Sequence, residues 1–151
     1  MTRSLRLSLC LLALSGLALG FLSGCSSPAG PSPVPCTETT AFAGTAQVIP
    51  NNPHSQSITT TATGALDVSV DWTSASNIMN VVLAQAPCTT DMLQASGCNV
   101  LFSAWSPPKP LKESTTLLPA GSYVLIVGNP NPAPETITAQ VILRSAGRPV
   151  P

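Results

Sequence analysis

The chain has 151 residues, with six basic side chains, six acidic side chains and a single histidine. So few charges cannot form the dense basic face that binds nucleic acid, and no nucleic-acid partner is expected. One histidine also leaves little for a catalytic triad or a metal centre, so we expect no enzyme activity, no cofactor and no metal site.

The N-terminal segment carries two arginines, Arg3 and Arg6, and continues as an apolar run from Leu7 to Leu22. The run is shorter than the ~20 residues of a transmembrane helix and is typical of a secretory signal. It leads into Leu-Ser-Gly-Cys at residues 22–25, which resembles the lipobox of bacterial lipoproteins. This resemblance implies that residues 1–24 are removed, that a diacylglycerol is attached to the thiol of Cys25, and that the new amine is acylated.

Acyl chains on Cys25 would hold the protein at a membrane, since each buried CH₂ contributes ~0.8 kcal/mol. Ser26 follows the cysteine, and in lipoproteins similar to those of enteric bacteria this implies delivery to the outer membrane. The alternative is an ordinary cleaved signal peptide, with Cys25 in a disulfide.

The residues after the anchor, SSPAGPSPVP, are too polar and too rich in proline to fold, so they predict an extended linker. The expected organisation is a signal peptide at 1–24, an anchor and linker at 25–36, a folded domain at 37–145 and a flexible tail at 146–151. The sequence therefore predicts a small domain tethered by lipid in the cell envelope.

Three cysteines remain after Cys10 and Cys25 are set aside: Cys36 at the edge of the domain, and Cys88 and Cys98 within it. Disulfides persist in exported proteins, and Cys88 and Cys98 flank a short polar segment, which makes them the favoured pair. Closing so short a loop would stabilise the fold by ~3 kcal/mol. Three thiols nevertheless allow three pairings, so Cys36 is either a free thiol or displaces one of the two partners.

The folded part consists of short alternating runs separated by turn residues, with no long helical period. The clearest run is GALDVSVDW, in which apolar and polar residues alternate strictly, as in a half-buried strand. The run at 77–85 is apolar on both faces, which indicates a central strand. The expected strands are 39–49, 56–62, 64–73, 77–85, 99–105, 113–118, 122–129 and 135–145.

Eight strands in a domain of this size predict an all-β protein, a two-layer antiparallel β-sandwich. The single helical candidate is residues 90–95, which Thr89 or Thr90 would cap. Tyr123 enters a strand directly after a Pro119–Gly121 turn, and this predicts a tyrosine corner whose hydroxyl bonds back to the turn.

Four segments together, GALDVSVDW, NVVLAQ, LPAGSYVLIVGN and ETITAQVIL, resemble the bacterial pre-peptidase C-terminal domain. The resemblance spans Phe42 to Leu143. It implies a jelly-roll-like sandwich of the kind appended to secreted enzymes or carried on surface proteins. Some members of such families bind calcium, carbohydrate or collagen, but this chain has no acidic cluster in its loops that would favour calcium.

Several side chains are candidates for function. Trp72 continues an inward-facing series and is predicted to lie in the core. Trp105 ends a strand before the stiff SPPKP loop, so Trp105, with Lys109 nearby, is the candidate partner-binding site. His54 lies in a turn-like segment and is not expected to bind metal.

Two carboxylates, Asp67 and Asp71, share one strand face. Residues four apart on a strand lie ~13 Å apart, so these two cannot chelate one ion and are expected to be solvated.

The anchor, the linker and the missing catalytic set predict a non-catalytic envelope protein whose sandwich presents loops to a protein or glycan partner. The alternative is a structural or assembly subunit that associates through strand edges. In that case the Thr-rich strand at 56–62 would be the exposed edge.

Overall fold

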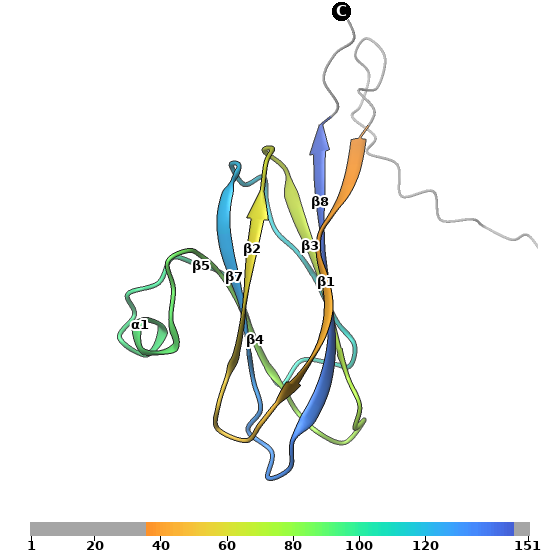
Figure 1. Ribbon diagram of the computed structural model, residues 1–151, viewed down its shortest axis with the longest axis vertical. Helices are drawn as coiled ribbons and strands as arrows, with labels where there is room; N and C mark the ends of the chain where they lie inside the picture. The colour runs from red at the N-terminus through yellow and green to blue at the C-terminus, as the bar shows by residue number, and fades with distance from the viewer. Residues whose placement is uncertain (1–35, 147–151) are drawn as a thin grey trace, which may run out of the picture.

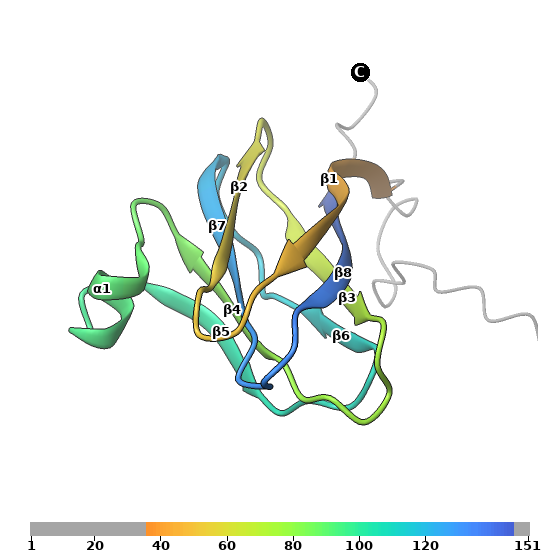
Figure 2. The same ribbon diagram turned by 60° about the horizontal axis from the view of Figure 1, so that its bottom comes forward.

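The computed structural model describes residues 36–146, which form two four-stranded antiparallel sheets packed face to face (Figures 1 and 2). Sheet A has the order β1-β8-β3-β6 and sheet B the order β2-β7-β4-β5. The predicted eight-stranded β-sandwich is confirmed. In chain order the elements are β1 (Cys36–Val48), β2 (His54–Thr60), β3 (Ala65–Trp72), β4 (Asn80–Gln85), α1 (Thr90–Gln94), β5 (Val100–Trp105), β6 (Leu111–Ser114), β7 (Gly121–Gly128) and β8 (Glu135–Ala146).

The core lies between the two sheets and follows from the period of two in the strands. On β3, the side chains of Leu66, Val68, Val70 and Trp72 are all buried, as predicted for the inward face. The indole nitrogen of Trp72 donates to the carbonyl of Asn77, so its polar edge is satisfied inside the fold.

The central strands of sheet B are buried on both faces. Residues 81–84 of β4 and 123–127 of β7 are buried without interruption. β4 lies between β7 and β5, so the predicted central strand is confirmed, but it begins at Asn80 and residues 77–79 belong to the turn before it. Burial on both faces requires something outside sheet B to cover its outer face, and the segment that carries α1 does so in part.

The prediction for β6 is displaced along the chain. The structure places this strand at Leu111–Ser114 rather than at 113–118. Leu111 packs into the core directly after Pro110, and this starts the strand early. The strand ends where Thr115 takes over pairing with Leu66: its backbone N–H donates to the Leu66 carbonyl, while its hydroxyl accepts from the Leu66 N–H.

Two local predictions are confirmed. The hydroxyl of Tyr123 donates to the carbonyl of Pro119 at 2.5 Å, which is the expected tyrosine corner. Burial of the phenol raises its pKa. Thr89 caps α1, with its hydroxyl accepting from the backbone of Met92 at 3.3 Å.

The first and last strands are partners, in a register that runs from Cys36 opposite Ala146 to Val48 opposite Glu135. The two ends of the described chain therefore lie at one end of the sandwich, at the top of Figure 1. We call this the terminal end. The opposite end, the loop end, carries the turns at 49–53, 73–79 and 129–134.

The segments predicted to export and anchor the chain, which are the signal peptide, the lipidated Cys25 and residues 26–35, lie outside the described residues, as does the tail beyond Ala146. Within residues 36–146, no helix has the length and apolar character needed to cross a membrane.

Candidate partner-binding groove

Trp105 is a large aromatic residue that is exposed to solvent over 67% of its surface. It is the last residue of β5, where alternation turns Ala104 toward the core and Trp105 to the outer face of sheet B. The next residue, Ser106, has a φ of 55°, and its backbone N–H donates to the carbonyl of Met79. This bond fixes the point at which the chain leaves the sheet and thereby fixes the base of the Trp105 side chain.

A groove of about 560 Å³ lies on the outer face of sheet B beside Trp105. Its floor is formed by Val82 and Ile126, which stand opposite each other on β4 and β7 and are each 3% exposed. Leu93 and Gln94 of α1 also line the groove, as does Val100 of β5. The groove is therefore built from three strands and the helical segment.

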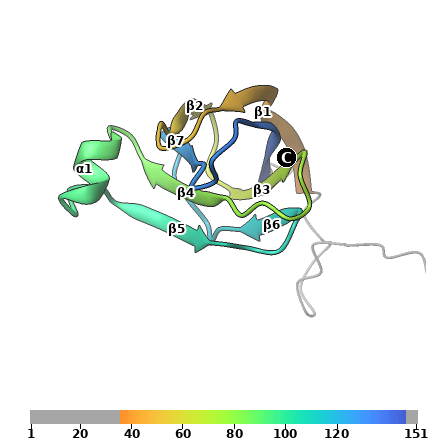
Figure 3. The same ribbon diagram turned by 90° about the horizontal axis from the view of Figure 1, so that it is seen from below.

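The segment that carries α1 is held on sheet B by a disulfide and by apolar packing. Cys88 and Cys98 are bonded, with their Cα atoms 5.3 Å apart, which confirms the favoured pairing. Cys36 neither displaces a partner of this pair nor is a free thiol. Leu93 packs on a cluster of outer-face residues that includes Val82 and Ile126. Figure 3 shows α1 standing out beside β4 and β5.

The groove is electrically neutral. None of the residues that line it carries a charge, and its polar members are Asn80, Thr90, Gln94 and Ser103. Within residues 36–146, the side-chain amides of Asn80 and Gln94 make no hydrogen bond. The amide of Asn77, by contrast, is used inside the fold, where it bonds to Glu135. The amides of Asn80 and Gln94 are therefore available to a ligand.

The groove lies toward the loop end of the molecule. Asn80 stands opposite Trp105 on one side and Gly128 on the other, and Gly128 ends β7 just before the turn to β8. Trp105 is therefore placed away from the terminal end, where Cys36 and Ala146 lie.

Lys109 does not join Trp105 at the groove. Its ammonium lies 3.2 Å from the carboxylate of Asp71, on β3 of the other sheet. The structure thus separates the two residues that the sequence placed together, because the chain turns away from sheet B at Ser106.

The outer face of sheet A carries charge. The guanidinium Nε of Arg144 lies 2.6 Å from Asp67 and 3.3 Å from Glu38, and the hydroxyl of Ser114 donates to Asp67. Asp71 is exposed, as expected for a solvated strand face. Asp67 is not: its side chain is only 22% exposed, so the expectation of a simply solvated carboxylate is wrong for this residue.

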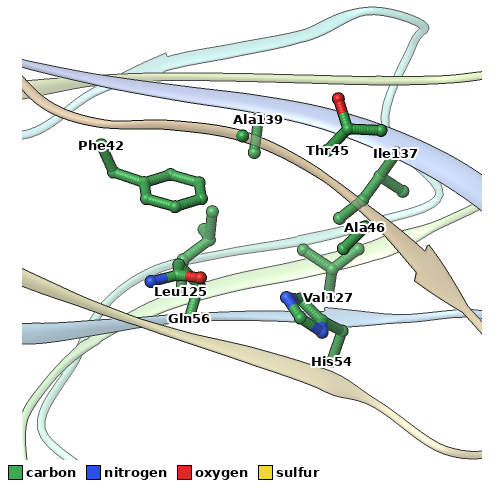
Figure 4. Close-up of a pocket in the computed structure, with 10 residues that line it drawn as sticks. Phe42, Thr45, Ala46, His54, Gln56, Leu125, Val127, Ile137 and Ala139 are labelled. Carbon is green, nitrogen blue, oxygen red and sulfur yellow. The ribbon is translucent and has the colours of Figure 1, made fainter.

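A smaller cavity of about 180 Å³ lies between the edges of the two sheets, where β1 faces β2 (Figure 4). Phe42 from β1 and His54 from β2 lie at its two sides, over Leu125 and Val127. Gly44 makes room for the aromatic ring, since a Cβ there would lie 2.8 Å from Phe42. Its walls are mostly apolar, and the polar side chains among them are Thr45, His54 and Gln56.

Glu135 is a buried carboxylate that the sequence analysis did not single out. It is 1% exposed and accepts hydrogen bonds from the hydroxyl of Thr73, the backbone of Ser74 and the amide of Asn77. Burial alone would raise its pKa, but these bonds outweigh burial and lower the pKa to about 2. A signal was present in the sequence, because Glu135 is in phase with the inward residues Ile137 and Ala139.

The hydrogen bonds of Glu135 give it the role of a structural tie. In the described part of the chain, no group of three or more His, Cys, Asp or Glu side chains is placed to hold a metal ion. The bonds of Glu135 instead join the start of β8 to the turn after β3.

Comparison with models of known protein families gives no match for this chain, and comparison with curated proteins also gives none. The likeness to the pre-peptidase C-terminal domain and to bacterial lipoproteins therefore stays a prediction from sequence. The proposed function therefore rests on the fold and on the groove beside Trp105.

Proposed function

We propose that this protein is a lipid-anchored, non-catalytic component of the cell envelope, held at the outer membrane, that binds a protein or glycan partner through the groove beside Trp105. One observation carries the proposal: an indole that is 67% exposed stands at the rim of a neutral groove with an apolar floor. Exposed aromatic side chains of this kind are the usual anchors of binding surfaces.

The position of the groove supports the same proposal. A lipid on Cys25 would tether the chain from the terminal end, where Cys36 begins β1. The groove lies toward the loop end. A partner could then reach Trp105 without entering the space next to the membrane.

Crosslinking in intact cells tests the binding function. The full-length protein and its Trp105→Ala variant would be crosslinked and purified, and the captured molecules compared by mass spectrometry. We expect a partner that is captured by the wild type and lost from the variant. Leu117→Ala is the matched control, because Leu117 is 70% exposed but does not line the groove. Equal capture by all three proteins would refute the assignment to this groove.

The anchor is tested separately by labelling cells with radioactive palmitate. We expect Cys25→Ser to abolish the label and to release the protein from the membrane fraction. Cys10→Ser is the control, since Cys10 belongs to the predicted signal peptide and its loss should leave the label in place. Persistent labelling of the Cys25→Ser variant would contradict the lipid anchor.

The second candidate function is assembly through strand edges. It is favoured by β2, which is an edge strand of sheet B with Ser55, Ser57 and Thr59 exposed. β1 of sheet A lies beside β2, however, and limits access to that edge (Figure 3). Analytical ultracentrifugation of the purified protein over a wide concentration range separates the candidates, because edge assembly requires oligomers and groove binding does not.

A further inference from the structure

We infer that the groove beside Trp105 binds an uncharged oligosaccharide, with one sugar ring stacked on the indole. This inference rests on the proposed binding function and names the chemical class of the partner. It follows from four properties of the groove: its charge, its free polar groups, the backbone of its floor and its size.

Charge complementarity favours an uncharged ligand. The lining residues include no acid and no base, and the charged pairs Asp67–Arg144 and Asp71–Lys109 belong to the other sheet. A ligand with carboxylates or phosphates would give up hydration in the groove and gain no opposite charge in return. A neutral sugar loses no such charge hydration.

The polar groups of the groove suit hydroxyls. A sugar ring has an apolar face of C–H groups and an edge of hydroxyls that both donate and accept hydrogen bonds. The exposed indole of Trp105 offers a flat apolar surface to the C–H face of the sugar. The free amides of Asn80 and Gln94 both donate and accept hydrogen bonds, so they suit the hydroxyl edge.

The floor of the groove disfavours an added peptide strand. A peptide that binds by strand addition needs an open sheet edge with unpaired N–H and C=O groups. The floor residues Val82 and Ile126 belong to β4 and β7, and each of these strands is paired on both sides. The floor therefore offers a ligand side chains rather than backbone, and the edge strand β5 borders the groove only at its side, through Val100, Ser103 and Trp105.

The size of the groove agrees with a short oligosaccharide. Its volume of about 560 Å³ lies within the range of small-molecule sites, which is roughly 300–1,000 Å³. The groove is open rather than enclosed, so the ends of a longer chain can extend out of it.

The two tryptophans make a direct test possible. The full-length lipidated protein would be labelled with ¹⁵N-tryptophan and kept in a zwitterionic detergent that has no sugar headgroup. It has two indole N–H signals, and a Trp105→Phe variant identifies which belongs to Trp105. Trp72 is 3% exposed and bonded to Asn77, so its signal serves as an internal reference.

The probes are cellohexaose, maltohexaose and chitohexaose as neutral sugars, hexagalacturonate as a charged sugar, and a neutral Gly/Ser/Ala hexapeptide. We expect at least one neutral sugar, at millimolar concentration, to shift the Trp105 signal and leave the Trp72 signal in place. Trp105→Ala should weaken that binding at least tenfold by calorimetry, or about 1.4 kcal/mol. Leu117→Ala should bind like the wild type.

The inference is overturned if no neutral sugar moves the Trp105 signal, or if hexagalacturonate or the peptide moves it more strongly. These failures can be separated from a failure of the proposed function. If crosslinking captures a protein through Trp105 while no sugar shifts its indole, only the glycan inference falls. If neither method finds a ligand, the binding function itself is refuted.

Discussion

The outer faces of the two sheets differ, although both sheets contribute to one core. On sheet A, polar side chains alternate with the core residues, and Asp67 is paired with Arg144 in contact with water. On sheet B, the corresponding positions of β4 and β7 are apolar, among them Val82 and Ile126, and a disulfide-closed segment packs on them. Sheet A thus faces solvent through charge, whereas part of the outer face of sheet B is covered by another segment of the chain.

This difference shows where a small sandwich can place a binding site. A strand that alternates apolar and polar residues turns its polar face to water, and nothing is gained by covering that face. A strand that is apolar on both faces must be covered on its outer face as well. Where the covering segment ends, apolar side chains are left as the floor of a groove. The groove at Trp105 lies at such a limit of the cover, next to Leu93 and Gln94.

The largest expected effect comes from removing the disulfide that holds the cover on sheet B. We expect a Cys88→Ala, Cys98→Ala double variant to lose about 3 kcal/mol of unfolding free energy, because the unfolded chain is no longer constrained. Urea denaturation measures the loss, and increased binding of a hydrophobic dye would report exposure of Val82 and Ile126. Thr89→Ala, which removes only the helix cap, should cost about 1 kcal/mol and is the control. An unchanged urea midpoint in the double variant would show that packing alone holds the segment.

A smaller effect is expected at Glu135, a buried carboxylate that accepts hydrogen bonds from neutral groups. Folding lowers its pKa from 4.5 to about 2, so in this range the folded protein binds fewer protons than the unfolded chain. The stability that Glu135 contributes is therefore complete above pH 4.5 and is lost as the pH falls toward 2. Glu135→Gln should cost about 1–3 kcal/mol at neutral pH, because donors to the carboxylate lose their partner, and should flatten the acid limb of the stability profile.

The control for Glu135 is Glu113→Gln, since Glu113 is exposed on β6. This variant should retain the wild-type acid limb. Thermal unfolding from pH 2 to pH 7 compares the three proteins. If Glu135→Gln and the wild type lose stability in parallel as the pH falls, Glu135 does not act as a buried charged tie.

The smallest effect is expected on sheet A. Asp67→Asn should lower the unfolding free energy by less than about 1 kcal/mol, because Asp67 and Arg144 are partly exposed and water screens their attraction. The loss should shrink further in high salt. Asp71→Asn is the matched control, with a more exposed carboxylate and a smaller expected loss. If Asp67→Asn lowers the unfolding free energy by more than Glu135→Gln does, the ion pair between Asp67 and Arg144, rather than contact with water, stabilises the outer face of sheet A.

The strands and the core could be predicted because alternation is a local property of the sequence. It assigned Trp72 to the core, and the apolar pattern on both faces of 77–85 indicated a central strand, which is β4. The cover on the outer face of β4 could not be predicted, because the side on which α1 packs depends on tertiary contacts rather than on its own residues. The apolar floor of the groove could thus be predicted from the residues of the strand, whereas the wall formed by α1 could not.

The failures at Lys109 and Glu135 have other causes. The direction of the chain after Trp105 depends on a left-handed backbone at Ser106, and no glycine marks that turn. Glu135 is satisfied by Thr73, Ser74 and Asn77, which lie about sixty residues away in the sequence. Pairings of this range arise only when the sheets come together.

The pairing of the first strand with the last has a mechanical consequence. A lipid tether that pulls on Cys36 while a ligand holds the loop end would load β1 along its own axis, against β8. Hydrogen bonds between antiparallel strands lie across that axis, so the force is shared by the whole ladder in shear instead of opening one bond at a time. The strand nearest the proposed tether would therefore also be the one arranged to resist extraction under such a load.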